Sequence, residues 1–182
     1  MELKATKLSK SYSDKKVVDK IDITVSSGQT VGLLGPNGAG KTTFFYMIAG
    51  LLSCDSGDVF INNNKITKEN ISTRSSKGLS YLPQEPSIFR RLSVSENIMA
   101  GLEQRENIEY SDKKNILNDL LDEFGLLKFK HTKSILLSGG ERRRLEIARA
   151  LACNPSFLLL DEPFAGIDPI AVSDLKETIK KL

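Results

Sequence analysis

The spacing of apolar residues predicts strands in the first part of the chain and again near its end. Residues 3–8 (LKATKL) and 21–25 (IDITV) alternate apolar and polar side chains, as half-buried strands do. Residues 30–35 (TVGLLG) and 157–160 (FLLL) are short continuous apolar runs, which are typical of buried strands. Residues 55–62 (DSGDVFIN) read as a turn followed by a further strand.

Helical spacing replaces this pattern over most of the remaining sequence. The segment 41–52 is apolar nearly all round, which predicts a helix buried in a domain. From about Pro86 onward the helices become amphipathic, and Ser93 and Glu96 have the spacing of a capping box. The next helix is expected to end at Gly125, and its apolar face holds Ile116, Leu117, Leu120, Leu121 and Phe124.

The last segment also reads as a helix. Asp168 and Pro169 have the character of an N-cap and a first-turn residue. An apolar stripe follows them and runs to the final residue without a stop signal, so we expect a chain that has been cut short. The stripe consists of Val172, Leu175, Ile179 and Leu182.

Composition narrows the class of protein without naming a function. The chain has 182 residues, of which 40% are hydrophobic and 27% charged, enough for one domain with a core. The net charge of +3 is mild and its basic residues are dispersed, which argues against nucleic acid as a partner. Cys54 and Cys153 have no metal spacing and fit reduced thiols in the cytosol. No run approaches the roughly 18 apolar residues of a membrane span, so we expect no direct membrane insertion.

A glycine-rich segment carries the clearest chemical signal. Residues 35–42, GPNGAGKT, match the phosphate-loop pattern GxxxxGK[ST] between a predicted strand and a predicted helix. The glycines let backbone amides approach phosphates, and the helix start adds positive potential. Lys41 is expected to reach the terminal phosphates, and the Thr42 hydroxyl is expected to bind Mg²⁺. The alternative is a glycine turn that matches by chance. The residues assigned to nucleotide binding here are Gly35, Pro36, Asn37, Gly38, Ala39, Gly40, Lys41, Thr42 and Thr43.

Two acidic residues follow the second apolar run. Asp161 and Glu162 come at its carboxyl end, where side chains of a parallel sheet point into the ligand crevice. We expect Asp161 to hold Mg²⁺ and Glu162 to act as the base that polarises water. The competing interpretation of Glu162 is a solvated acid at a strand end. Gln84, between Pro83 and Pro86, reads from the sequence alone as an ordinary polar loop residue.

The stretch LLSGGERRRLEIARALA, residues 136–152, contains a second turn suited to phosphate. Ser138 and Glu141 have capping-box spacing, so a well-capped helix is the simple interpretation. That interpretation leaves the two glycines unexplained, since they weaken a helix and expose amides to an anion. Leu145, Ala148, Leu151 and Ala152 form its expected buried stripe, and the three arginines Arg142, Arg143 and Arg144 can be read as a solvated face.

These motifs together resemble the ATP-binding-cassette ATPases. The resemblance covers the whole chain through GPNGAGKT, Gln84, LSGGE, FLLLDE and the loop of Gly166, Ile167 and Asp168. It implies an α/β fold: a phosphate-loop, RecA-like core with an antiparallel β subdomain and an inserted helical subdomain. The core would comprise 1–86 and 136–182, incomplete at its end, and the helical subdomain 87–135.

The resemblance also implies roles for particular residues. ATP and Mg²⁺ would be the cofactors, and Lys41, Gln84 and Glu162 would take part in hydrolysis, with Gln84 also contacting the metal. In this family two copies face each other head to tail. The turn of one copy, here Ser138, Gly139, Gly140 and Glu141, binds the phosphate held by the other. Tyr12 would stack on adenine, or else be a plain strand-end tyrosine.

Several stretches resemble more particularly the cytoplasmic ATPases of bacterial lipopolysaccharide export. They are YLPQEPSIFRRLSV and LSGGERRRLEIARALA together with LLDEPFAGIDPI. The protein would then lie on the inner face of the inner membrane, with its permease contacting Phe89, Arg90 and Arg91. A solvated basic turn is the other interpretation of those three residues. Branched-chain amino acid importer ATPases are the relatives most easily confused with this group.

The resemblance fails at the carboxyl end. The family's switch histidine would follow the end of this sequence. His131 precedes the turn at residues 138–141, the signature turn of the family, and reads as a solvated loop residue. We therefore expect the 182-residue chain to bind nucleotide weakly and to hydrolyse it very slowly. Two other classes stay open at this point: a soluble cassette protein acting on ribosomes or DNA, and a module that only binds nucleotide.

Overall fold

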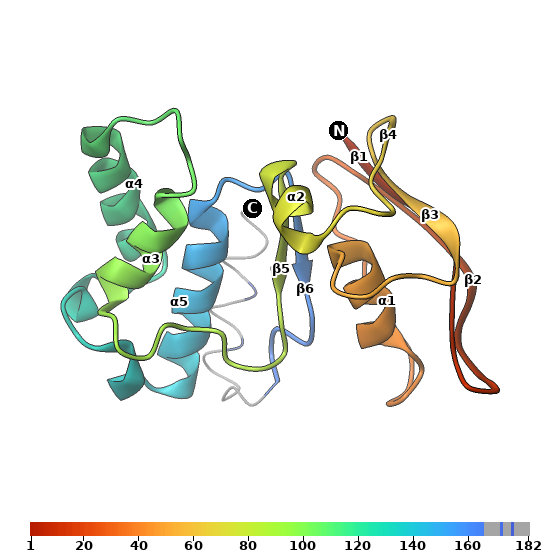
Figure 1. The fold of residues 1–182 in the computed structure, drawn as a ribbon. Helices are drawn as coiled ribbons and strands as arrows, with labels where there is room; N and C mark the ends of the chain where they lie inside the picture. Colours follow the sequence, from red (N-terminus) through yellow and green to blue (C-terminus); the bar gives the residue numbers. More distant parts are fainter. Residues whose placement is uncertain (166–171, 173–175, 177–182) are drawn as a thin grey trace. The chain divides into compact units, whose positions relative to one another are not determined.

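The computed structural model describes residues 1–165, 172 and 176 (Figure 1). The chain divides into two compact units, residues 1–80 and 81–182. The expected helix beginning at Asp168, with Leu175, Ile179 and Leu182, lies outside the described residues, as does the loop of Gly166 and Ile167. The assignment of 136–182 to the same domain as 1–86 stays a prediction.

The first unit is built on an antiparallel sheet with the strand order β2-β1-β3-β4. The strands are β1 (Glu2–Tyr12), β2 (Lys15–Ser26), β3 (Ser56–Ile61) and β4 (Asn64–Lys65). Leu3 and Ala5 pair with Ile61 and Val59 of β3 and are buried with them, which is the alternation expected for one covered face. The strands predicted at 3–8, 21–25 and 55–62 are therefore confirmed.

Helix α1 (Lys41–Ala49) belongs to the same unit and begins directly after the glycine loop. Phe44, Met47 and Ile48 are buried, whereas Tyr46 is partly exposed, so the helix is covered on most sides but not all. Gly50 ends it in a left-handed conformation. The unit also contains α2 (Ile71–Ser76), whose buried Arg74 donates to the carbonyls of Met47 and Ile48 at the end of α1.

One predicted strand is wrong. Residues 30–35 are assigned no strand, and Leu34 is 93% exposed. A buried strand needs neighbours that accept and donate its backbone hydrogen bonds, and no strand in the described part of the chain pairs with this segment. The apolar run alone gave no information about those partners.

The second unit joins a two-stranded sheet to a helical bundle (Figure 1). The sheet pairs β5 (Leu79–Leu82) with β6 (Phe157–Leu160), and β6 confirms the predicted strand at 157–160. The main helices are α3 (Val94–Leu102), α4 (Tyr110–Glu123) and α5 (Gly139–Ala152), with short 3₁₀ turns η1 (Leu127–Phe129) and η2 (Ser134–Leu136) between the last two. Their core includes Ile98, Leu102, Leu121, Phe124, Leu145 and Ala148.

The helix boundaries follow the capping signals in the sequence. Ser93 and Glu96 form the predicted capping box at the start of α3. After α4, Gly125 has a φ of 60°, a left-handed conformation that ends the helix. Gly101 of α3 lies against α5, where an added Cβ would come within 2.7 Å of the carbonyl oxygen of Arg149, so the two helices pack closely. None of the helices in the described part of the chain combines the length and apolar character needed to cross a membrane.

Candidate nucleotide site and signature turn

The glycine loop of the first unit is shaped to leave backbone amides open. Gly40, the N-cap of α1, has a φ of 87° and offers no side-chain cap, and the first turn of the helix carries no acidic residue. The amides of Lys41, Thr42 and Thr43 therefore have no intrahelical acceptor by geometry, and the helix dipole adds positive potential there. This end of the helix fits a phosphate, which supplies the missing acceptors.

Close contacts explain why the loop needs glycine. A Cβ on Gly40 would lie 2.4 Å from the carbonyl oxygen of Val17, closer than any carbon can approach. The loop is thus pressed onto β2, in the hairpin that also carries Tyr12. Tyr12 ends β1, pairs with Lys15 and is half exposed, as a ring available for stacking must be. Tyr12 and the residue that the loop contacts, Val17, therefore lie in the same β1–β2 hairpin.

Lys41 folds back over its own loop. Its Nζ donates to the carbonyl oxygens of Gly35 and Pro36 at 2.8 and 2.9 Å. These bonds keep the ammonium group beside the amides of the loop, where it can add a full positive charge to their partial charges. The residues present thus fit a polyanionic ligand, while the strand expected before the loop is the part of the prediction that is wrong.

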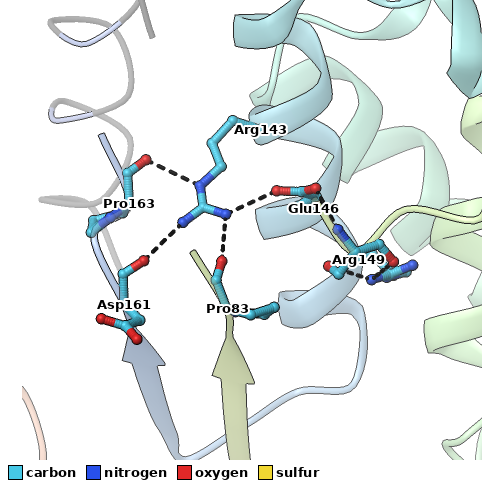
Figure 2. A network of polar contacts seen from close by, with 7 residues as sticks. Pro83, Arg143, Glu146, Arg149, Asp161 and Pro163 are labelled. Atoms are coloured by element: carbon cyan, nitrogen blue, oxygen red, sulfur yellow. Dashed lines mark hydrogen bonds and ion pairs between the residues drawn. The ribbon is translucent and has the colours of Figure 1, made fainter. Parts of the chain in front are cut away.

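In the second unit, β5 and β6 bring together three of the predicted residues. The strands run in the same direction and end side by side (Figure 2). The amide of Asp161 donates to the carbonyl of Leu82 at 3.0 Å. Asp161 is buried and accepts a hydrogen bond from the Tyr81 hydroxyl. Gln84 Nε2 donates to Glu162 Oε2 at 2.8 Å, although the two residues are far apart in sequence.

Glu162 has an unusual backbone. Its φ is 44°, in the left-handed region that non-glycine residues enter rarely and at a cost of about 1–2 kcal/mol. Such a conformation persists only where its surroundings enforce it. Glu162 is exposed, directly follows the buried carboxylate of Asp161 and contacts a glutamine, and its role as the base stays a prediction.

The signature turn begins α5 and is satisfied by its own side chains. Ser138 Oγ accepts from the amide of Glu141, and Glu141 Oε2 accepts from the amide of Ser138 at 2.9 Å. The predicted capping box is confirmed. The box leaves the amides of Gly139 and Gly140 without intrahelical acceptors, so the turn still has donors for an anion.

The solvated-face interpretation of the arginines that follow is wrong for Arg143, whereas Arg142 and Arg144 are only partly buried. Arg143 is 6% exposed and Glu146 is 2% exposed. Figure 2 shows Arg143 between the ends of β5 and β6, with Glu146 beside it. Sequence reasoning missed Glu146 entirely. The available signal was a basic and an acidic residue three positions apart on a helix that is otherwise apolar on that side. Of the expected buried stripe, Leu145, Ala148 and Ala152 are buried and Leu151 is only partly buried, and His131 is exposed as predicted.

The fold and the phosphate loop define a phosphate-loop nucleotide-binding protein. More specifically, the family described as ABC transporter matches residues 18–165. The chain belongs to this family, and it is an ATP-binding-cassette ATPase.

Its curated relatives include subunits of a named export system. The chain is 50% identical to the "Lipopolysaccharide export system ATP-binding protein LptB" of Escherichia coli (strain K12), over 99% of this chain and 75% of the relative. It is 52% identical, with the same coverage, to the protein of that name from Haemophilus influenzae. An "Uncharacterized ABC transporter ATP-binding protein R00382" of Rhizobium meliloti is 53% identical, over 96% of this chain and 64% of the relative.

Solved cassettes share the fold. A nucleotide-free ATP-binding cassette from an ABC transporter superposes with a TM-score of 0.85 at 27% identity, covering 100% of this chain and 77% of that one. The cassette MJ0796, described as a dimeric post-hydrolysis state bound to ADP and Pi, gives 0.85 at 25% identity, over 99% and 82% of the two chains. The predicted α/β cassette fold is confirmed.

Proposed function

We propose that this chain is the ATP-hydrolysing subunit of a transporter that exports lipopolysaccharide. The observation that carries the proposal is the 50% identity to LptB across nearly the whole chain. On this proposal the protein lies in the cytoplasm at the inner face of the inner membrane, where membrane-spanning partner subunits hold it.

Each residue of the site has a proposed role. The amides of the loop 35–43 and the Lys41 ammonium bind the phosphates of ATP, and Tyr12 stacks on its base. Thr42, Asp161 and Gln84 would hold Mg²⁺, a cation that prefers oxygen ligands and, with ATP, supplies charge neutralisation at the transferring phosphate. Mg²⁺ therefore suits the hydroxyl, carboxylate and amide oxygens of these three side chains.

Glu162 is the proposed base. Because Oε2 accepts from Gln84, Oε1 is the oxygen left to take a proton from the attacking water. The buried Asp161 directly before it stays a metal ligand rather than a second base.

A second copy would complete the site. The amides of Gly139 and Gly140, framed by Ser138 and Glu141, face the phosphate bound by the other copy's loop in a head-to-tail dimer. This arrangement explains why the chain has a phosphate loop and a separate turn suited to an anion.

The membrane partners would contact the segment Phe89, Arg90 and Arg91. The Phe89 side chain is 51% exposed although its backbone is fixed at both ends: its amide and carbonyl both bond to the buried Asn97. A rigid, exposed aromatic next to two arginines suits a protein interface.

The test is transport by the full-length natural protein, co-purified with its membrane subunits and placed in proteoliposomes. ATP should drive the release of lipopolysaccharide, Glu162→Gln should abolish it, and Phe89→Ala should reduce the yield of the complex without reducing ATPase activity of the isolated subunit. ATP-driven leucine movement with no effect on lipopolysaccharide would instead assign the chain to an amino acid importer.

A further inference from the structure

One buried guanidinium holds three backbone carbonyls at the ends of β5 and β6 (Figure 2). Arg143 Nη1 donates to the carbonyl of Pro83 at 2.8 Å, Nε to that of Pro163 at 3.1 Å, and Nη2 to that of Asp161 at 3.3 Å. The planar fork of arginine carries its donors on three nitrogens and spans three separated carbonyls, whereas lysine carries all its donors on one nitrogen and lacks that span.

The three carbonyls bracket two proposed catalytic side chains. Pro83 directly precedes Gln84, and Asp161 and Pro163 lie on either side of Glu162. Arg143 therefore fixes the backbone around both members of the Gln84–Glu162 hydrogen bond. Its grip on both neighbours of Glu162 also supplies the surroundings that the left-handed backbone of that residue requires.

Glu146 holds Arg143 in place and extends the network. Its Oε2 accepts from Arg143 Nη1 at 2.9 Å, and its Oε1 accepts from the amide of Ser87 at 2.9 Å. Arg149 donates to both the carbonyl and the hydroxyl of Ser87, and its guanidinium lies 4.8 Å from the centre of the Phe89 ring. Segment 83–89 is thus bound to α5 at both ends.

Stability alone is a weak reason for such a pair. Removing two charges from water costs about as much as their attraction returns, and apolar replacements of the same size are often no less stable. The three carbonyl contacts, by contrast, require a guanidinium held in this orientation, which apolar residues could not replace.

We propose that Arg143 and Glu146 are positioning residues that hold Gln84 and Glu162 in the arrangement needed for hydrolysis. The proposal rests on the proposed ATPase function, although neither residue touches ATP. They act through the backbone at 83 and at 161–163.

Arg143→Lys in the full-length natural protein is the sharpest test, because it keeps a positive charge beside Glu146 but loses the three-nitrogen fork that spans the three carbonyls. We expect kcat to fall on the order of 100-fold, as it does when catalytic groups shift by about 1 Å, without a comparable change in the KM for ATP. The amide of Asp161 should also lose protection from hydrogen exchange. This measurement does not depend on ATPase activity.

Glu146→Gln is the second variant and tests the proposal if Arg143→Lys does not fold. The side-chain carbonyl of the glutamine can still accept from the amide of Ser87, but it offers no negative charge to Arg143. We therefore expect kcat to fall while the amide of Ser87 stays protected from exchange. Leu117→Ala is the stability control. It leaves a cavity where α4 packs into the hydrophobic core, and it should lower the melting temperature with kcat retained.

The outcomes separate the two proposals. If Lys41→Ala and Glu162→Gln leave the ATPase rate of the parent unchanged, the proposed function is wrong. If those variants are inactive but Arg143→Lys and Glu146→Gln keep the parental kcat, or lose it only in proportion to melting temperature as Leu117→Ala does, the positioning role is wrong.

Discussion

Helices α1 and α5 both have glycines at their N-terminal ends, yet their first amides are satisfied in different ways. The start of α1 has a left-handed glycine as N-cap, no capping side chain and no acid in its first turn. The start of α5 has a serine N-cap and a glutamate that together satisfy two amides. A helix end without acceptors is costly, so the first arrangement is suited to a permanent ligand.

The second arrangement is suited to an intermittent ligand. The capping box stabilises α5 when no anion is near, and only Gly139 and Gly140 keep unused amides. On the proposed dimer these amides meet a phosphate only when a second copy closes. On this proposal the difference separates a primary binding loop from a turn that binds a partner's nucleotide, and four predictions test that division.

The largest effect is expected at Gly40, because its loop geometry has two independent requirements. Gly40→Ala places a Cβ 2.4 Å from the Val17 carbonyl in a backbone with a φ of 87°. We expect a loss of about 3 kcal/mol in the free energy of unfolding, from the left-handed backbone and the clash together. Urea unfolding of the isolated protein measures it.

Gly38→Ala is the matched control for Gly40→Ala. Gly38 also has a positive φ, 78°, but a Cβ there meets nothing within 4 Å. Its cost should be limited to the backbone term of about 1 kcal/mol. Equal losses for the two variants would show that the contact with β2 does not shape the loop.

Lys41→Ala tests whether α1 is the permanent site. Losing a charge-assisted bond to phosphate should weaken ATP binding by about 2 kcal/mol, roughly thirtyfold in Kd, with the fold retained. Titration calorimetry measures the Kd. Lys16→Ala removes an exposed lysine from the neighbouring hairpin and should leave the Kd unchanged. A folded Lys41→Ala protein with parental affinity would contradict the assignment of the phosphate loop.

These two regions also show how far sequence reasoning reaches. Both turns, both capping boxes and the α4 stop at Gly125 were predictable because each depends on residues within one helical turn. The strand at 30–35 was not, because a strand depends on ladder partners that its own sequence does not specify. Arg143 was misread for the same reason: its acceptors at 83, 161 and 163 are distant in the chain.

The proposed catalytic residues lie between these cases. Asp161 and Glu162 follow from their place at the end of an apolar run, and β6 confirms that run. Gln84 has no local signal, and only the family resemblance singled it out before the structure placed it on Glu162. Contacts between distant segments thus account for most of what the sequence alone could not supply.

Ser138→Ala tests the intermittent site at a smaller scale. Losing the cap should cost about 1 kcal/mol in the free energy of unfolding. It should also weaken the ATP-dependent dimer, measured by sedimentation in the Glu162→Gln background so that ATP is retained. Ser93→Ala is the control, since it removes the equivalent serine from the capping box of α3, where no glycines follow. We expect a similar loss of stability there with dimer formation intact. A dimer that both variants weaken equally would mean that the turn of α5 acts only as a cap.

Glu141→Gln should have the smallest effect and addresses the acid at the signature turn. Glutamine also completes a capping box, so α5 should lose only the favourable charge at its N-terminus, about 0.5 kcal/mol. The carboxylate would repel a phosphate approaching Gly139 and Gly140, and its removal should therefore tighten the ATP-dependent dimer, more at low salt than at high salt. Sedimentation at two ionic strengths, again in the Glu162→Gln background, measures both effects. Glu96→Gln makes the same change in the capping box of α3 and should leave dimer formation unchanged. If Glu141→Gln instead weakens the dimer at both salt concentrations, the carboxylate contributes to dimer closure. The proposal that the Glu141 carboxylate stabilises the helix start and repels the phosphate would then be wrong.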